Sequence, residues 1–265
     1  MEKIRVLVTG IAGRMGQEVA RAVIGDPELT LVAGIDVCRI GEDLGRLVGR
    51  EPLGIAVESD LTRAIQDHQP HVMVEFTSPE TAAGNILTAL SLGVRPVVGT
   101  TGLSEETLKE ISEICDVKGL GCLIASNFAL GAILMMKFAA SAAEYFPDVE
   151  IIELHHDQKM DAPSGIALST ARAIAALREK HSQGHPQEVE KLQGARGADY
   201  EGIRVHSVRL PGYLAHQEVI FGGLGQTLTI RHDTISRESF MPGVLLGIKR
   251  IANYRKLIIG LENIL

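Results

Sequence analysis

The residues best suited to chemistry lie in one stretch, residues 153–168. Two adjacent imidazoles, His155 and His156, are followed by the amine of Lys159. The preceding residues, 148–154, are rich in Val and Ile and predict a short strand. The stretch therefore predicts a strand end that is followed by a loop carrying three groups able to donate a proton or to hold an anion.

A helix is predicted directly after this loop, over residues 166–180, where apolar residues recur at helical spacing. Pro163 cannot continue a helix from before it, and Ser164 is a good N-cap. The amides of Gly165 and Ile166 would then lie at the positive end of a helix without backbone acceptors, which is a favourable site for an anion. We expect a pocket for an anionic substrate with a proton donor beside it.

A solvated strand end is the plain alternative for the same residues. Neighbouring strand residues point to opposite faces, so His155 and His156 can enter one pocket only if the strand has ended by His156. The remainder of the chain must decide between the two interpretations.

The composition excludes several classes of protein. A chain of 265 residues can form one large domain or two modest ones, and a net charge of −7 argues against nucleic acid as a partner. The three cysteines, Cys38, Cys115 and Cys122, lack metal-type or redox-type spacing. Strand-like residues follow Met1 almost directly, which leaves no room for a signal peptide, and no apolar run reaches membrane-spanning length. We expect a cytoplasmic protein with no metal, no membrane partner and no nucleic-acid partner.

The N-terminal residues predict a dinucleotide site. A strand over residues 3–8 leads into the glycine-rich turn 9–16, then a helix, then a second strand over residues 29–35 that ends in Asp36. In such a unit the glycines permit a tight turn and let backbone amides approach a pyrophosphate. The turn departs from the strict pattern, because Ala12 stands at the second glycine place and Gly13 just after it.

Asp36 indicates which nucleotide is preferred. A carboxylate at this position accepts hydrogen bonds from the ribose hydroxyls and repels a 2′-phosphate. Val37 follows it where a clear NADPH binder would have an arginine, although Arg39 is near enough to reach. We expect NADH to be favoured and NADPH to be the alternative.

Three further strands, predicted over residues 71–76, 94–98 and 120–125, each end in small and polar residues. In an open parallel sheet the ligand lies across the carboxyl ends of the strands. Taken singly, each of these loops is also compatible with an ordinary strand-to-helix turn. Together they predict a lining for the nicotinamide end, formed by Phe76, Thr77, Gly99, Thr100, Thr101, Ala125, Ser126, Asn127 and Phe128.

The alternation of strand and helix stops at residue 127. A long helix over residues 129–145 follows, and three strands then come in succession over residues 204–210, 217–221 and 227–231, before a final helix over residues 240–254. Consecutive strands after a βα series indicate a separate α+β region. The expected fold class is α/β, with a Rossmann-type doubly wound parallel sheet over residues 1–127 and 236–265 and an inserted α+β domain over residues 128–235.

These motifs together resemble the 4-hydroxy-tetrahydrodipicolinate reductase (dihydrodipicolinate reductase) family over essentially the whole length. The resemblance is carried by the block at residues 153–165, which is highly specific, and by the shorter segments Val8-Thr-Gly-Ile-Ala-Gly-Arg-Met-Gly16, Phe76-Thr77, Gly99-Thr-Thr-Gly102, Ser126-Asn-Phe-Ala-Leu-Gly131, Val208-Arg-Leu-Pro-Gly212 and His216-Gln-Glu-Val219. It implies NAD(P)H-dependent reduction of a cyclic dicarboxylate in lysine and diaminopimelate biosynthesis, with hydride delivery to ring carbon four.

The resemblance also implies roles for individual residues. His155 would be the general acid and Lys159 a second proton donor, because hydride addition leaves an enamine anion that must be protonated. His156, Ser164, Gly165 and Ile166 would bind the substrate carboxylate. The cofactor loop would contribute Gly10, Ile11, Ala12, Gly13, Arg14 and Met15 besides Asp36. The family resemblance further suggests a homotetramer built through the sheet of the inserted domain.

One position departs from the family pattern. The family usually has threonine where this chain has Ile166, so one hydroxyl contact to the carboxylate is lost while the backbone amide remains. We expect weaker substrate binding, by roughly fivefold for one neutral hydrogen bond. Two alternatives stay open: another Rossmann oxidoreductase with an amino-acid-like substrate, and a nucleotide-sensing or substrate-shifted relative.

Overall fold

The computed structural model describes residues 2–179 and 181–265, which form two compact units. One unit contains the chain up to Phe128 together with Phe240–Leu265, and the other contains Ala129–Ser239. The predicted boundaries, after residues 127 and 235, lie shortly before these. The two ends of the chain thus meet in the same unit, as the changes in sequence pattern predict.

The first unit is built on a seven-stranded parallel sheet in the order β12-β6-β5-β4-β1-β2-β3. Strand β1, which lies between β4 and β2, is buried over most of its length, with Val6, Leu7 and Val8 all inaccessible to solvent. Such burial on both faces is typical of a doubly wound sheet. The strands are β1 (Ile4–Thr9), β2 (Leu29–Ile35), β3 (Val57–Glu58), β4 (Val72–Glu75), β5 (Arg95–Val98), β6 (Cys122–Ile124) and β12 (Leu257–Ile259).

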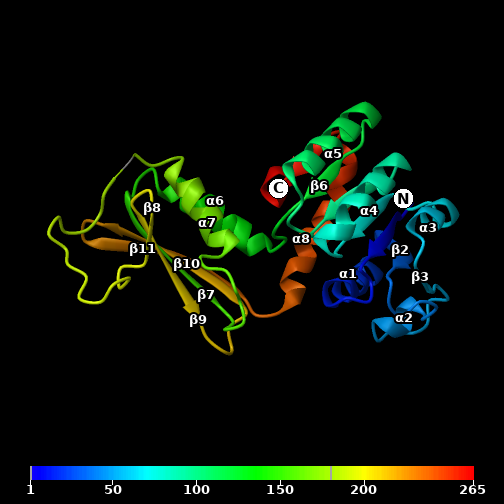
Figure 1. Cartoon of the computed structure of the whole chain (residues 1–265), viewed down its shortest axis with the longest axis horizontal. Coiled ribbons are helices and arrows are strands. Elements are labelled where there is room, and N and C mark those ends of the chain that lie inside the picture. Colours follow the sequence, from blue (N-terminus) through cyan, green and yellow to red (C-terminus); the bar gives the residue numbers. More distant parts are fainter. Residues whose placement is uncertain (1, 180) are drawn as a thin grey trace. The chain divides into compact units, whose positions relative to one another are not determined.

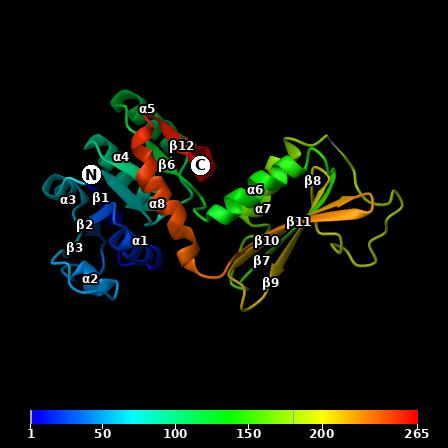
Figure 2. The ribbon, with the colours of Figure 1, turned by 180° about the vertical axis from the view of Figure 1, so that it is seen from behind.

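Helices connect these strands, and their starts follow from capping side chains. Asp60 accepts a hydrogen bond from the amide of Arg63 at 3.0 Å, and Ser104 accepts one from Thr107 at 3.1 Å. The last helix, α8, packs against α1 and β5 (Figure 2). The helices are α1 (Arg14–Gly25), α2 (Leu44–Leu47), α3 (Leu61–His68), α4 (Pro79–Ser91), α5 (Glu105–Lys118) and α8 (Met241–Arg250).

The second unit is a mixed five-stranded sheet in the order β11-β10-β7-β9-β8. Strand β7 pairs in parallel with β9 and antiparallel with β10. Helices α6 (Leu130–Ala142) and α7 (Gly165–Ala175) lie along one face of this sheet (Figure 1), where Ile151, Val205 and Phe221 form the core with them. The strands are β7 (Asp148–His155), β8 (Ala198–Tyr200), β9 (Ile203–Arg209), β10 (Ala215–Gly223) and β11 (Gln226–Thr234). The predicted fold class is therefore confirmed.

Several boundaries differ from the prediction. Helix α7 ends at Ala175, earlier than predicted, and the predicted last residue, 180, lies outside the described residues. Beyond the helix end, the guanidinium of Arg178 donates to the carbonyls of Pro147 and Glu201. Residues 39–56, predicted to be loop, contain the short helix α2. The predicted C-terminal helix divides into 3₁₀ turns at Arg237–Phe240 and Ile251–Asn253 on either side of α8, and a last 3₁₀ turn spans Leu261–Ile264.

None of the described helices is long and apolar enough to cross a membrane.

Candidate active site

The site predicted around residues 153–168 forms at the carboxyl end of β7. Glu153 and His155 are alternate residues of this strand, so their side chains lie on the same face, which is the face covered by α6 and α7. Glu153 is inaccessible to solvent, and its carboxylate forms a short hydrogen bond with Nδ1 of His155. The imidazole of His155 is therefore held from behind by a buried carboxylate.

Arg209 on the neighbouring strand β9 completes this cluster. It lies directly opposite His155 in the parallel pairing, and its guanidinium donates to the two carboxylate oxygens of Glu153 at 2.9 and 2.7 Å. Burial raises the pKa of Glu153, but hydrogen bonds from His155, Arg209 and Ser207 lower it to about 2. The carboxylate is consequently ionised at neutral pH.

Arg209 also connects the strand to the loop that follows β7. Its guanidinium donates to the backbone carbonyl of Asp161 at 2.8 Å. Within the loop, Nζ of Lys159 donates to the side chain of Asp161 at 2.6 Å, and this contact lowers the pKa of Asp161. The loop is thus fixed at Asp161, close to the amine that the sequence analysis singled out.

The start of α7 forms the other side of the site. Ser164 is the N-cap predicted from the sequence, and its hydroxyl accepts a hydrogen bond from the amide of Ala167 at 3.2 Å. The amide of Ser164 donates to Glu153 at 3.3 Å. In the first turn the amides of Gly165 and Ile166 remain for an external acceptor.

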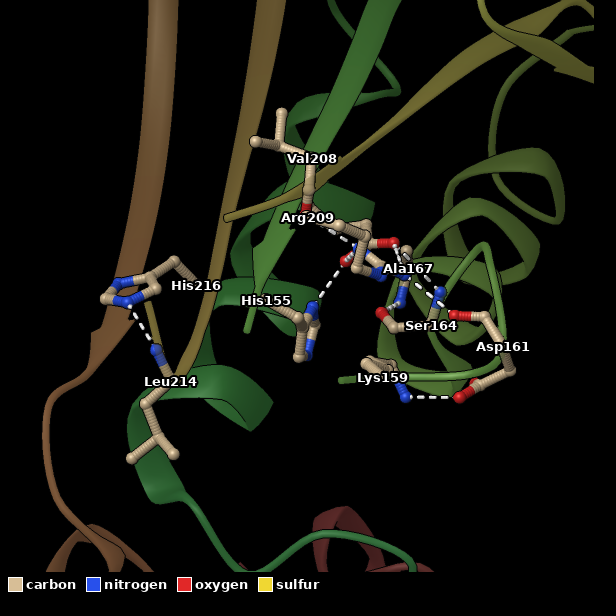
Figure 3. A network of polar contacts seen from close by, with 10 residues as sticks. His155, Lys159, Asp161, Ser164, Ala167, Val208, Arg209, Leu214 and His216 are labelled. Atoms are coloured by element: carbon tan, nitrogen blue, oxygen red, sulfur yellow. Dashed lines mark hydrogen bonds and ion pairs between the residues drawn. The ribbon is translucent and has the colours of Figure 1, made fainter. Parts of the chain in front are cut away.

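Figure 3 shows how these elements converge. His155 from β7, Lys159 from the loop, Ser164 from the start of α7 and Arg209 from β9 gather at one end of the second unit. A ring nitrogen, an amine and a helix N-terminus that face one place can hold a carboxylate and deliver a proton. The solvated strand end considered in the sequence analysis does not describe this cluster, because Glu153 and Ser164 are buried.

His156 lies immediately after the last residue of β7 and is half-buried. The strand has therefore ended where the prediction required it to end. The contacts described above join His155, Lys159 and Ser164 but do not include the imidazole of His156, so its role as a carboxylate ligand stays a prediction.

Sequence reasoning did not recognise the parts played by Glu153 and Arg209. An acidic residue two positions before a histidine on a strand was the available signal for Glu153, since such residues share a face. No local signal existed for Arg209, which is 56 positions away from Glu153 and reaches it only through the pairing of β7 with β9.

The glycine-rich turn in the first unit has the geometry of an anion site. Gly10 has a φ of +71°, and a Cβ there would lie 2.4 Å from the carbonyl oxygen of Phe76. A Cβ on Gly16 would lie 2.0 Å from the carbonyl oxygen of Gly10, so α1 and the turn pack too closely for any side chain. Gly13 is the N-cap of α1 and offers no side-chain acceptor to the first helical amides, which leaves them for a phosphate group. These residues fit the pyrophosphate of a dinucleotide, and Ile11, Ala12, Arg14 and Met15 belong to the same turn and helix start.

Asp36 lies beside this turn, at the end of β2. Its carboxylate accepts hydrogen bonds from the amides of Ala12 and Cys38, both at 2.9 Å. Arg39 forms a bidentate ion pair with Glu42, with both contacts at 2.6 Å. The cation that could have compensated a 2′-phosphate is thus already engaged.

A buried carboxylate, Glu75 at the end of β4, organises the predicted nicotinamide side. It accepts hydrogen bonds from the hydroxyl of Thr9 at 2.6 Å, the amide of Thr77 at 2.7 Å and the hydroxyl of Thr100 at 3.4 Å. These contacts join the end of β1 to the loops after β4 and β5. Sequence reasoning missed this function of Glu75, because it depends on one strand end and two loops that are distant in sequence.

Aromatic rings fill the remainder of this edge of the sheet. A Cβ on Gly99 would lie 2.0 Å from the ring of Phe76, and the rings of Phe76 and Phe128 are 6.0 Å apart. The structure thus brings Phe76, Thr77, Gly99, Thr100 and Phe128 together. The other predicted lining residues belong to the loops after β5 and β6, namely Thr101, Ala125, Ser126 and Asn127.

Among the described residues, no cluster of His, Cys, Asp and Glu has an arrangement that could hold a metal ion.

Known proteins resemble this chain over its full length. The family model for the dihydrodipicolinate reductase N-terminus matches residues 4–128, and the model for the C-terminus matches residues 131–265. The chain is 52% identical to the 4-hydroxy-tetrahydrodipicolinate reductase of Desulfitobacterium hafniense over the full length of both, and 52% identical to that of Moorella thermoacetica over 99% of this chain and 98% of the other. A solved structure of dipicolinate-bound dihydrodipicolinate reductase from Paenisporosarcina sp. TG-14 is 48% identical, with a TM-score of 0.90, over 99% of this chain and all of that chain.

Matches of this extent show which fold and which reaction the chain has, and they confirm the family that the sequence motifs indicated. The chain belongs to the 4-hydroxy-tetrahydrodipicolinate reductase family and is an NAD(P)H-dependent oxidoreductase of lysine and diaminopimelate biosynthesis.

Proposed function

We propose that the second unit binds the dehydrated form of 4-hydroxy-tetrahydrodipicolinate and that His155 protonates it after hydride transfer to ring carbon four. The observation that carries this proposal is the convergence of His155, Lys159 and the N-terminus of α7 at one place (Figure 3). The solved relative from Paenisporosarcina, which holds dipicolinate, shares this fold and supports a planar dicarboxylate as the ligand class.

The reduced nicotinamide supplies the hydride in this reaction, and the protein supplies the proton. His155 donates the proton from Nε2, since Nδ1 is engaged by Glu153. Lys159 places a positive charge beside the anion and acts as a second proton donor. One substrate carboxylate would be held by the amides of Gly165 and Ile166, with Ser164 and His156 at its flank.

The proposed carboxylate contacts predict different kinetic effects for variants of His156 and Lys159. His156→Gln should raise KM with little change in kcat, because a carboxylate contact stabilises ground and transition states alike. Lys159→Ala should lower kcat and raise KM, because it removes both a proton donor and a positive charge. Steady-state rates of NADH oxidation, with substrate generated from pyruvate and aspartate semialdehyde, measure both effects. An unchanged KM in both variants would contradict the assignment.

The first unit would bind the dinucleotide and use NADH at least as well as NADPH. Asp36 offers a carboxylate where a 2′-phosphate would lie, and Glu42 engages the nearby Arg39. Freeing that arginine with Glu42→Ala should therefore improve NADPH binding relative to NADH, and combining Asp36→Ala with Val37→Arg should improve it further. Dissociation constants for both nucleotides test this. The proposal fails if the unaltered protein binds NADPH more than tenfold tighter than NADH.

The oligomer would be a homotetramer formed through the sheet of the second unit. Helices α6 and α7 both pack on the face that contains Ile151 and Val205. The opposite face contains Ile152, Val208 and Ile220, which are half-buried in the single chain. Light scattering after size exclusion should give the mass of four chains, and replacing Ile220 with Asp should reduce it.

A further inference from the structure

Glu153 accepts hydrogen bonds from three different parts of the site, yet no step of the proposed reaction uses it. Its buried carboxylate accepts from His155, from two nitrogens of Arg209 and from the amide of Ser164. The proton donor, the neighbouring strand and the helix start thus meet at one pair of oxygen atoms. A group that links these parts can control how they face the substrate.

We propose that Glu153 and Arg209 form a positioning pair that orients His155 for proton donation. This inference rests on the proposed role of His155 as the acid. The carboxylate holds Nδ1, which fixes the ring and leaves Nε2, on its far side, as the nitrogen that faces the substrate.

Arg209 makes this arrangement compatible with an anionic substrate. An unpaired carboxylate behind the acid would repel a dicarboxylate, whereas the guanidinium neutralises it through two parallel hydrogen bonds. Arg209 also donates to the carbonyl of Asp161, which fixes the loop that carries Lys159. A single side chain therefore holds the buried carboxylate and the loop with the second cation.

The charged groups around His155 can be identified from each neighbouring element. Glu153 belongs to β7, Arg209 to β9, and Lys159 and Asp161 to the loop after β7. On the other neighbour, β10, the residue opposite Glu153 is Gln217, which is uncharged and donates to Thr170 of α7. The other carboxylate in this set, Asp161, is paired with Lys159, so it does not replace the charge that Glu153→Gln removes.

The same strand offers a matched control. Glu150 of β7 also bridges an arginine and a histidine, with Arg196 at 2.7 Å and His206 at 2.8 Å. It lies three positions earlier and on the opposite face of the sheet. Glu150→Gln thus removes a similar charge from a similar cluster away from the site.

Glu153→Gln should lower kcat by about 10- to 100-fold, the size typical for losing a partner that orients a functional histidine. Glu150→Gln should leave kcat unchanged. KM for the substrate should change little in Glu153→Gln, because the lost contact orients the acid and does not touch the substrate. In the double variant with His155→Gln, kcat should equal that of His155→Gln alone, since Glu153 acts through His155.

These measurements separate the two proposals. If His155→Gln lowers kcat but Glu153→Gln does not, the positioning pair is refuted and the role of His155 stands. If the double variant loses activity as the product of the two single losses, Glu153 acts elsewhere and the inference is also refuted. An unchanged kcat in His155→Gln refutes the proposed function itself. Should Glu153→Gln fail to fold, Arg209→Lys takes its place in the cycle, because it keeps the charge and gives up the second hydrogen bond.

Discussion

At the scale of single residues, Ile166 is the feature that sets this chain apart from the pattern expected of its family. It is the second residue of α7, and its side chain packs in part against the core formed by α6, α7 and the sheet. The backbone amide remains in the first turn, where an anion can accept from it. The loss therefore concerns one hydroxyl and leaves the helix N-terminus in place.

Restoring that hydroxyl should strengthen ligand binding. Ile166→Thr should lower the dissociation constant for pyridine-2,6-dicarboxylate by roughly fivefold, the value of one neutral hydrogen bond. Ile166→Val is the matched control, because it keeps the branched shape without the hydroxyl and should bind like the unaltered protein. Isothermal titration measures all three. Weaker binding by Ile166→Thr would indicate that the site is adapted to a different substrate.

The chemistry of the site was predictable from sequence where it depends on neighbours in the chain. His155, Lys159 and Ser164 are within ten positions of one another, and their spacing around a strand end and a helix start is informative. The contact between Glu153 and Arg209 was not predictable, because it depends on the register of two strands. Register is set by the hydrophobic patterns of both strands and by their connections, and the residues next to Glu153 do not reveal it.

At the scale of elements, helix starts were predictable and short elements were not. Ser104 and Ser164 cap α5 and α7 as their sequence contexts indicate. The strands β8 and β12 have three residues each, and strands that short form only because longer neighbours hold them. The segment after α7 is tied down by Arg178, whose hydrogen-bond partners lie in distant segments and could not be predicted locally.

The end of β7 should be a source of acid sensitivity. The pKa of Glu153 is about 2 in the folded chain and 4.5 ordinarily. A lowered pKa contributes stability that is complete above about pH 4.5 and is lost as the pH falls towards 2. The free energy of unfolding should therefore decrease over this window by on the order of 3 kcal/mol from this group.

Glu153→Gln removes this contribution, so the stability difference between the unaltered protein and the variant should shrink from pH 6 to pH 3. Denaturant unfolding at several pH values measures this difference. It is followed by far-UV circular dichroism, because the chain has no tryptophan for a fluorescence signal. Glu150→Gln serves as the control for a more exposed carboxylate on the same strand. A difference that stays constant with pH would contradict the account of Glu153.

At the scale of the whole molecule, the chain forms two units and completes the first unit with its own C-terminal segment. Helix α8 and strand β12 return to the sheet begun by β1, with β12 pairing beside β6. The change of pattern near residue 127 made this insertion predictable. The returning strand β12 was not predictable, since its three residues carry no alternation of their own.

The central claim is that His155 delivers the proton in the reduction, and its kcat tests this most directly. The unaltered protein and His155→Gln are compared for NADH oxidation with substrate generated from pyruvate and aspartate semialdehyde. His206→Gln is the control, because His206 also pairs with a carboxylate, that of Glu150, outside the site. We predict that kcat falls ~10²–10⁴-fold in His155→Gln, the usual contribution of a general acid, and stays unchanged in His206→Gln. An unchanged kcat in His155→Gln would contradict the account.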